Sequence, residues 1–249
     1  MLVSKQKRKA IVVGATSGIG KEVVKVLTSS GWEVGIASRN QSELQFLQSR
    51  NLNIVATECI DITSADADQL LMKLIGKMGG IDLYFHSSGI GYQNRSLDIE
   101  KELLTISTNV NGMVRMVDTS FNYFTQCPDK KGTIAVISSI GGTKGLGPAP
   151  AYSSSKRFVS HYLESLTQLC NIRKIKNITL LDIRPGFVKT PLLNDGNTYP
   201  MQMDASKVAK QIVKAIDKGK TRVTIDWKYR ILVFLWKLVP HWLWVRIRL

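Results

Sequence analysis

The turn GATSGIG, from Gly14 to Gly20, places three glycines between an apolar run at 10–15 and a helical stretch at 21–31. Glycine here lets the chain turn sharply off a strand and lets the backbone approach a ligand or the neighbouring sheet closely. A helix that begins at this turn offers free N–H groups and a positive dipole end to phosphate. The spacing G-x-x-x-G-x-G differs from the commoner G-x-G-x-x-G, but its physical demands are similar. The turn therefore predicts a βα unit that binds a dinucleotide; a tight turn without a ligand is the alternative.

Apolar strand-like runs alternate with amphipathic stretches along most of the chain. This alternation predicts an α/β fold: a Rossmann-type, doubly wound, seven-stranded parallel sheet with helices on both faces. We expect one dinucleotide-binding catalytic domain at 1–226 and an apolar, basic tail at 227–249. The loop at 190–203 is either a cover for a ligand or a surface connection. Strands are predicted at 10–15, 32–39, 53–61, 81–89, 132–139, 177–186 and 221–226, and helices at 21–31, 41–50, 64–78, 98–126, 151–171 and 204–219.

The composition bounds the partners of the chain. Its 34 Lys and Arg against 19 Asp and Glu give a net charge of +15, which favours anionic partners such as a phosphorylated cofactor or an anionic lipid surface. No helix-turn-helix, zinc-finger or RNA-binding signature is present, so we expect no nucleic-acid partner. The three cysteines are scattered without metal-ligand spacing, so we expect no metal site and a reducing, cytoplasmic location, with the membrane surface as a further option.

The residues after the second and third predicted strands indicate the type of cofactor. A dinucleotide fold that uses NAD usually has Asp or Glu after the second strand, where this chain has Ser38 and Arg39. An arginine suits a 2′-phosphate by charge and by its forked donors, so NADP(H) is favoured over NAD(H), which remains the alternative. Asp61 ends the third strand and is either an acceptor for the adenine amino group or the N-cap of the next helix.

Tyr152 and Lys156 lie four residues apart in a predicted helix, so their side chains share one face. Taken alone, the pair is better explained as two unrelated residues of a helix. A tyrosine beside an ammonium group can act as an acid or base, because the positive charge favours the phenolate and lowers the pKa of the phenol. The remaining motifs have to decide between these two explanations.

Taken in order, these motifs resemble the short-chain dehydrogenase/reductase family, from about Lys9 to Thr190. Asn109 precedes Gly112 as in the family motif N-x-x-G, and Ser139 stands thirteen positions before Tyr152. The segment from Pro185 to Thr190 matches P-G-x-V-x-T. Each motif is weak alone, but the six together in this order are highly specific: the glycine turn, Asp61, Asn109, Ser139, Tyr152-x-x-x-Lys156 and PGFVKT.

The resemblance implies roles for these residues. Tyr152 would be the acid/base, Ser139 would bind the substrate oxygen, Lys156 would tune Tyr152 and hold the nicotinamide ribose, and Asn109 would hold a connecting water. Asn111 is interpreted as a residue with local helix bonding. The implied cofactor site comprises Gly14, Thr16, Ser17, Gly18, Ile19, Gly20, Ser38, Arg39, Asp61, Ile62, Ser88, Gly89, Tyr152, Lys156, Pro185, Gly186, Val188 and Thr190.

One motif departs from the family pattern. After the fourth strand the family usually has N-N-A-G, whereas this chain has His86-Ser87-Ser88-Gly89. We expect altered hydrogen bonds beside the cofactor and no loss of chemistry. His86 is interpreted as a hydrogen-bonded structural substitute for Asn, with a catalytic base as the alternative.

The tail carries four of the five tryptophans but no 18-residue apolar run, because Lys237, Pro240 and His241 interrupt it. Pro240 is predicted to divide it into two short helices. On a helical wheel Arg230, Lys237, His241 and Arg248 fall within roughly 40° of each other, opposite a wide apolar arc. This pattern suits a helix on anionic lipid, and a wall over the substrate pocket and an oligomer interface are the alternatives.

The sequence therefore predicts an NADPH-preferring oxidoreductase that interconverts a carbonyl and a secondary alcohol, acting on an apolar or lipid-like substrate. A soluble reductase of 3-oxoacyl or small carbonyl substrates is one alternative, and an NADP(H)-binding sensor or scaffold without turnover is another. The resemblance implies a homodimer or homotetramer, formed through the helices at about 98–126 and 151–171.

Overall fold

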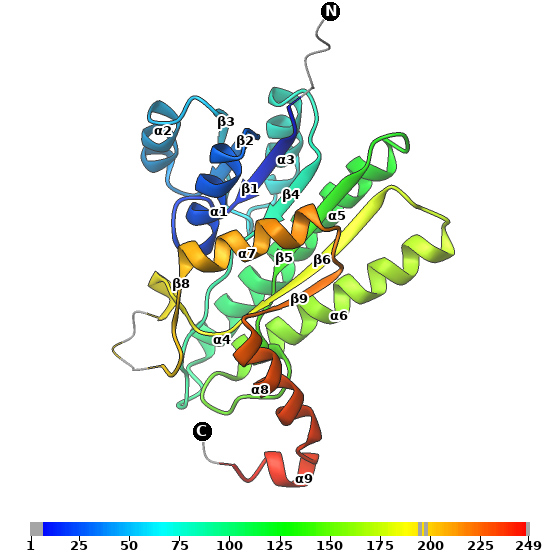
Figure 1. Cartoon of the computed structure of the whole chain (residues 1–249). Coiled ribbons are helices and arrows are strands. Elements are labelled where there is room, and N and C mark those ends of the chain that lie inside the picture. The colour runs from blue at the N-terminus through cyan, green and yellow to red at the C-terminus, as the bar shows by residue number, and fades with distance from the viewer. Residues whose placement is uncertain (1–6, 194–195, 197–198, 248–249) are drawn as a thin grey trace, which may run out of the picture.

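A seven-stranded parallel sheet forms the centre of the computed structural model, which describes residues 7–193, 196 and 199–247 (Figure 1). The strand order β3-β2-β1-β4-β5-β6-β9 places β1 next to β4, where the direction of winding reverses. Ligands of doubly wound folds bind beyond the carboxyl ends of strands at such a point. The predicted sheet is thus confirmed. Its strands are β1 (Lys9–Val13), β2 (Glu33–Ser38), β3 (Ile54–Cys59), β4 (Leu83–His86), β5 (Gly132–Ile137), β6 (Ile178–Pro185) and β9 (Arg222–Ile225).

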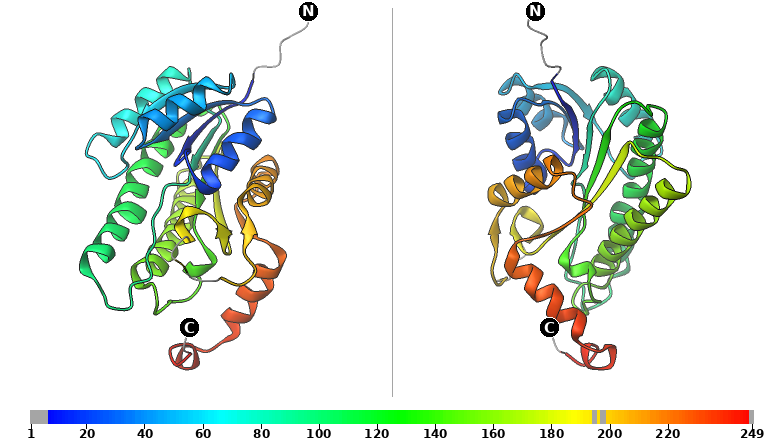
Figure 2. Two further views of the ribbon diagram at one scale, coloured as in Figure 1. Left: turned by 90° about the vertical axis from the view of Figure 1, so that its left-hand side faces the viewer. Right: turned by 45° about the vertical axis from the view of Figure 1, so that its right-hand side comes forward.

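Helices cover both faces of the sheet (Figure 2). Strand β1 supplies both cores, since Ile11 and Val13 pack with one set of helices while Ala10 and Val12 pack with the other. Alternating side chains of a strand point to opposite faces, so a continuous apolar run is what a doubly covered strand needs. One face carries α3 (Ala67–Lys77), α5 (Met113–Thr125) and α6 (Pro150–Ile172), and the other α1 (Gly18–Ser29), α2 (Gln41–Ser49) and α7 (Ala205–Asp217).

The long helical stretch predicted at 98–126 is not one regular α-helix. It consists of α4 (Ile99–Ile106), a π-helical segment at Ser107–Gly112, and α5. A π-helical turn adds a residue to the helical repeat and is frequently found at functional sites. Asn109 lies within this segment.

The connection after β6 has structure that the sequence analysis did not predict. Short strands β7 (Val188–Lys189) and β8 (Met203–Asp204) pair in parallel, and Pro191–Leu193 forms a 3-10 turn. The predicted loop at 190–203 falls partly outside the described residues. Its described ends bring Lys189 and Pro191 next to the first turn of α1.

The tail forms α8 (Trp227–Leu238) and α9 (His241–Trp244), with Pro240 between them as predicted. Strand β9 leads directly into α8, and both helices project from the end of the sheet where β9 terminates (Figures 1 and 2). Within the described ranges, no helix combines the length and apolar character needed to cross a bilayer.

Candidate active site

The glycine turn is built against two strands of the sheet. Gly14 has a positive φ of 82°, and its N–H donates to the carbonyl oxygen of Ala37 at 2.9 Å. A Cβ on Gly14 would lie 2.7 Å from the backbone nitrogen of Ser88. Ser17 occupies the N-cap position of α1, is exposed, and makes no capping bond with its side chain. The first turn of α1 therefore presents its N–H groups at the carboxyl edge of the sheet.

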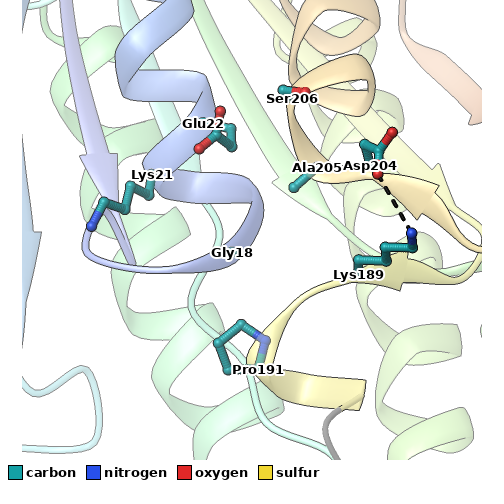
Figure 3. Close-up of a pocket in the computed structure, with 8 residues that line it drawn as sticks. All are labelled: Gly18, Lys21, Glu22, Lys189, Pro191, Asp204, Ala205 and Ser206. Carbon is teal, nitrogen blue, oxygen red and sulfur yellow. Dashed lines mark ion pairs between the residues drawn. The ribbon is translucent and has the colours of Figure 1, made fainter.

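A cavity of about 360 Å³ lies beside this turn (Figure 3). Gly18 and Lys21 form one side, and Lys189, Pro191 and the start of α7 face them. A Cβ on Gly18 would lie 3.3 Å from Cγ2 of Thr190, so the PGFVKT segment reaches the glycine turn in space. Lys21 pairs with Glu43 at 3.0 Å and Lys189 with Asp204 at 3.8 Å.

Ser38, Arg39 and Asp61 meet at the ends of β2 and β3. Ser38 is buried and its Oγ accepts from the N–H of Asn40 at 3.3 Å, while Arg39 is exposed. Asp61 accepts from the N–H and hydroxyl of Thr63, and these bonds, with a smaller effect of the Arg39 charge, lower the pKa of its carboxyl against the effect of burial. The N-cap alternative for Asp61 is wrong, because α3 begins at Ala67 with Asp66 at its N-cap position.

Asn109 is buried and tied to the loop that follows β4. Its Oδ1 accepts from the N–H of Ile90 at 2.8 Å, and its Nδ2 donates to the carbonyl oxygen of Ile90 at 2.7 Å. Nδ2 also donates to Ser155 Oγ of α6 at 3.0 Å. Asn111 is exposed. The π-helical turn thus directs one of these two asparagines inward, to the junction of the β4 loop and α6.

Lys156 reaches the same junction from α6. Its Nζ donates to the carbonyl oxygen of Ile137 at 3.0 Å, and a Cβ on Gly89 would lie 3.2 Å from both Lys156 Nζ and Asn109 Oδ1. Burial lowers the pKa of Lys156 from 10.5 to about 8. Gly89, Asn109 and Lys156 therefore meet at one point between β4, the π-helical turn and α6.

Ser139 and Tyr152 complete this group. Ser139 follows β5, and its Oγ accepts from the N–H of Gly141 at 3.0 Å. Burial raises the pKa of Tyr152 above 10, and the Ser139 hydroxyl lies close enough to oppose that rise. The expected lowering of this pKa by Lys156 is therefore wrong for the chain by itself, because Lys156 Nζ lies 5.9 Å from the Tyr152 ring and burial dominates.

His86 is a buried, uncharged residue of the sheet. Its Nδ1 forms a 2.8 Å hydrogen bond with the hydroxyl of Tyr84, and Nε2 has no partner in the part of the chain that the structure describes. Burial, with a smaller effect of the Lys156 charge, lowers the pKa of His86 to about 3. The hydrogen bond supports its interpretation as a structural residue, and such a pKa makes it a weak base.

The other candidate cofactor residues surround the same edge of the sheet. Thr16 lies within the glycine turn and Ile19 packs on the core below α1. Ile62 packs under Gly112, and Pro185 ends β6. Gly20 follows Ile19 in α1, and Ser88 lies in the loop after β4. Gly186 and Val188 follow Pro185 in the chain.

Two features near Tyr152 were missed. A Cβ on Gly91 would lie 2.5 Å from Cδ2 of Tyr152, and the charge of Tyr199 contributes to the raised pKa of Tyr152. The rings of Phe187 and Tyr199 lie 4.8 Å apart. The second glycine of Gly89-Ile90-Gly91 was the available signal, since it marks another close backbone approach.

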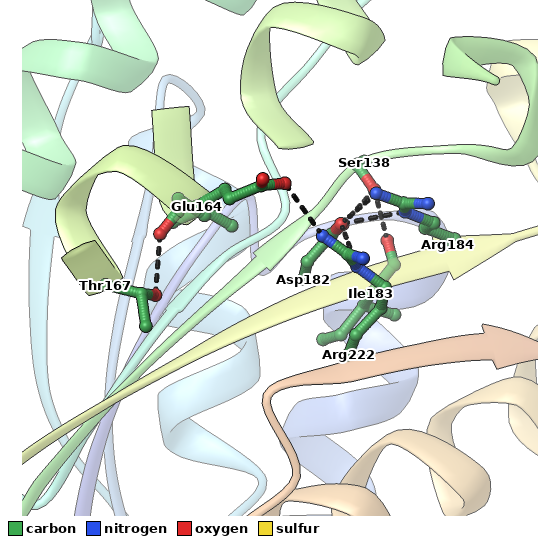
Figure 4. Close-up of polar contacts among 8 residues, drawn as sticks. Ser138, Glu164, Thr167, Asp182, Ile183, Arg184 and Arg222 are labelled. Atoms are coloured by element: carbon green, nitrogen blue, oxygen red, sulfur yellow. Dashed lines mark hydrogen bonds and ion pairs between the residues drawn. The ribbon is translucent and has the colours of Figure 1, made fainter. Parts of the chain in front are cut away.

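An ionic cluster around the buried Asp182 was also missed (Figure 4). Asp182 accepts from Arg184 Nε at 2.8 Å, lies 3.4 Å from Arg222 Nε, and accepts from the hydroxyl of Ser138. Glu164 of α6 pairs with Arg222 at 3.3 Å. The signal was a charged residue in an otherwise apolar strand, which requires a partner.

The residues present fit a dinucleotide. Two lysines flank the cavity at the start of α1, and the glycines of the turn leave its N–H groups open to phosphate. A protonated phenol, a serine hydroxyl and a buried ammonium lie at the end of the sheet beside that turn. Such a group can donate a proton to a bound oxygen atom and stabilise the charge that forms on it. Residues 7–193, 196 and 199–247 contain no cluster of three His, Cys, Asp or Glu side chains suited to a metal ion.

The chain is similar to one family of known proteins. The model of the short chain dehydrogenase family matches residues 8–200. An uncharacterised oxidoreductase of Myxococcus xanthus (strain DK1622) is 30% identical to this chain over 94% of its length and 93% of the relative's.

Two solved structures show the same fold. One is a variant of the actinorhodin polyketide ketoreductase with NADPH, with a TM-score of 0.75 and 23% identity over 88% of this chain and 95% of the other. The second is a 3-ketoacyl-(acyl-carrier-protein) reductase from Brucella melitensis complexed with NADH, with a TM-score of 0.77 and 19% identity over 88% and 96%.

Proposed function

Because the chain belongs to the short-chain dehydrogenase/reductase family, we propose that it is an NADPH-preferring reductase that interconverts a carbonyl and a secondary alcohol. Membership of this family makes the chain an oxidoreductase. The observation that carries the finer proposal is the convergence of Asn109, Ser139, Tyr152 and Lys156 beside the glycine turn.

The preference for NADP(H) rests on the end of β2. Ser38 and Arg39 replace the acidic residue that would accept from a ribose hydroxyl, and Arg39 is exposed and close enough to Asp61 to affect its carboxyl. The fold neighbours include one structure with NADPH and one with NADH, so they support a nicotinamide dinucleotide without ranking the two.

In this proposal the bound cofactor supplies a hydride to the carbonyl carbon. Tyr152 donates its phenolic proton to the carbonyl oxygen, and Ser139 donates a hydrogen bond that stabilises the charge forming there. The raised pKa of Tyr152 keeps the phenol protonated at neutral pH, as the reducing direction requires. Lys156 holds the ribose, and Asn109 holds a water through which Tyr152 regains its proton.

An apolar substrate is supported by the surroundings of Tyr152. The aromatic rings of Phe187 and Tyr199 pack together near it, and Ile140, directly after Ser139, belongs to an apolar cluster with Tyr229 and Val233 of α8. Such surroundings favour a lipid, acyl or sterol-like ketone over a small polar carbonyl.

The assembly and location are part of the same proposal. Exposed apolar side chains of α4 and α6, including Leu103, Leu104 and Phe158, support a homodimer or homotetramer through these helices. A cytoplasmic enzyme bound at the membrane surface through 227–249 fits the apolar and basic composition of that segment.

The test is turnover by the purified full chain with NADPH or NADH and a panel of carbonyls that extends from small ketones to long-chain ketones. Tyr152→Phe should lower kcat roughly 10²- to 10⁴-fold while leaving NADPH affinity intact, because only the proton donor is removed. Tyr162→Phe, on the same helix but bonded to Asp118, is the matched control and should keep its activity. An unchanged rate in Tyr152→Phe would reject the mechanism, and NADPH binding without any turnover would favour a sensor.

A further inference from the structure

Helix α8 has an inner face that is fixed to the body of the protein. Tyr229 and Val233 are buried, and the Tyr229 ring packs directly on Gly186, where no side chain could be accommodated. The Tyr229 hydroxyl contacts the carbonyl oxygens of Pro200 and Met201 at 3.1 and 3.0 Å. This face holds α8 in one orientation, so the opposite face is defined as well.

Helix α9 is anchored to the loop that follows Ser139. Trp244 is buried, and its Nε1 donates to the carbonyl oxygen of Gly145 at 2.8 Å. Lys144 Nζ donates to the carbonyl oxygen of Val239, between the two helices, also at 2.8 Å. The tail is thus a fixed element of the structure, with two points of attachment to the loop between Ser139 and Tyr152.

The outer face of α8 is apolar and exposed. Ile231, Phe234, Leu235 and Leu238 are 52%, 61%, 52% and 63% exposed. At about 100° per residue these four positions lie within an arc of about 100° on the helix. Exposed apolar side chains continue beyond Pro240, where Trp242 is 60% exposed. An exposed apolar face of this kind marks an interaction site.

Basic residues flank this apolar face on both sides. On the same wheel, exposed Lys228 lies beside one edge, and exposed Arg230 and Lys237 lie beside the other. Residues 227–249 contain no Asp or Glu. Long basic side chains beside an apolar stripe can extend to lipid phosphates while the stripe enters the acyl region. The charge and the shape of the face both match an anionic bilayer.

We infer that the outer face of α8 and α9, defined by Ile231, Phe234, Leu235, Leu238 and Trp242 with its basic flanks, docks the protein onto the surface of an anionic membrane. With 12 residues, α8 is about 18 Å long and therefore lies in the interface instead of spanning it. A second copy is a poorer occupant, because a two-fold contact through this face would bring its basic flanks together without any carboxylate of the tail to pair them.

Docking in this way places the bilayer next to the loop that carries Lys144 and Gly145, because the inner and outer faces belong to the same short helices. The inference concerns binding and stands whether or not the chain turns over a carbonyl. Its failure and a failure of the proposed reaction are therefore separate outcomes.

Co-sedimentation of the full chain with vesicles tests the inference, with phosphatidylcholine alone compared with phosphatidylcholine containing phosphatidylglycerol. The protein should sediment with the anionic vesicles. Phe234→Glu combined with Leu238→Glu should lower the partition coefficient roughly tenfold or more, and Arg230→Gln combined with Lys237→Gln should also lower it severalfold and reduce its dependence on salt. Leu52→Glu, at a 97% exposed leucine outside the tail, is the matched control and should bind like the wild type.

Circular dichroism and thermal unfolding show whether each variant is folded. We expect that each is, because all the substituted residues are exposed. Equal binding by the Phe234→Glu/Leu238→Glu variant, or no binding of the wild type to anionic vesicles, overturns the inference. Light scattering tests the alternative that a second copy covers this face. If the Phe234→Glu/Leu238→Glu variant had a lower mass than the wild type but bound vesicles equally, the face would be assigned to a second copy.

Discussion

The ring of Tyr152 packs directly against Gly91: a Cβ on Gly91 would lie 2.5 Å from Cδ2 and 2.9 Å from Cε2 of the tyrosine. Gly91 belongs to the loop after β4. The residue before it in this loop, Ile90, is held by two hydrogen bonds with the side chain of Asn109. The position of the tyrosine therefore depends on a backbone surface that only glycine provides.

Gly91→Ala is expected to displace Tyr152 or the loop, and a shift of about 1 Å in a catalytic group lowers a rate by up to about 10²-fold. We predict a 10- to 100-fold fall in kcat, roughly, with the NADPH dissociation constant unchanged. Gly147→Ala is the control, since a Cβ at Gly147 would meet nothing within 4 Å. Equal rates for both variants would show that the contact does not position Tyr152.

Trp244 anchors the loop between Ser139 and Tyr152 by a single polar bond. Trp244→Phe keeps an aromatic ring against Trp236, 5.4 Å away, but removes the hydrogen bond to Gly145. We expect a stability loss of about 1 kcal/mol and a severalfold lower kcat, with cofactor affinity retained. Steady-state kinetics and urea unfolding measure these effects. Trp242→Phe, at an exposed position of the same helix, should change neither, and a similar kcat loss there would contradict a role for the anchor.

Asp182 is a buried carboxylate and Glu164 an exposed one, and both pair with Arg222. We therefore predict that removing the charge of Asp182 lowers the free energy of unfolding much more than removing that of Glu164. Asp182→Asn removes the charge that two arginines and Ser138 surround, and leaving a buried cation unpaired costs about 3–5 kcal/mol. Glu164→Gln removes the exposed partner of Arg222 and should cost less than about 1 kcal/mol. Urea unfolding compares the two variants, and equal losses would show that burial does not govern this cluster.

The sheet, its helices and the group around Tyr152 could be predicted because each depends on a local pattern: apolar periodicity, glycine spacing and the interval from Ser139 to Tyr152. The π-helical turn could not, since the side chain of Asn109 bonds to Ile90, which is distant in the sequence. In the chain by itself, burial outweighs the expected lowering of the Tyr152 pKa by Lys156, and burial cannot be read from the spacing of the two residues.

The tail shows the same limit. Its sequence is apolar on several sides, so periodicity could not identify the side that packs on the protein. That choice depends on Gly186, against which the Tyr229 ring packs, and on the carbonyl oxygen of Gly145, which accepts a hydrogen bond from Trp244. The inward position of these two residues leaves the outer face of α8 exposed.

The lowered pKa of His86 predicts that the stability of the protein falls as the pH falls. Its pKa is about 3 in the folded chain and about 6.5 in an unfolded one, so the unfolded state binds the extra proton between these values. The stability contributed by neutral His86 is therefore present above about pH 6.5 and is lost as the pH falls toward 3. Between about pH 7.5 and pH 5 the wild type should lose about 2 kcal/mol relative to His86→Asn, which cannot take up this proton.

Urea unfolding of both proteins across this range measures the difference directly. The variant also loses the bond to Tyr84, so only the change of the difference with pH reports on the imidazole. Tyr84→Phe removes that bond while keeping His86, and it should follow the wild-type dependence, offset by a constant amount. A difference between the wild type and His86→Asn that stays constant with pH would mean that His86 is protonated equally in the folded and unfolded chains.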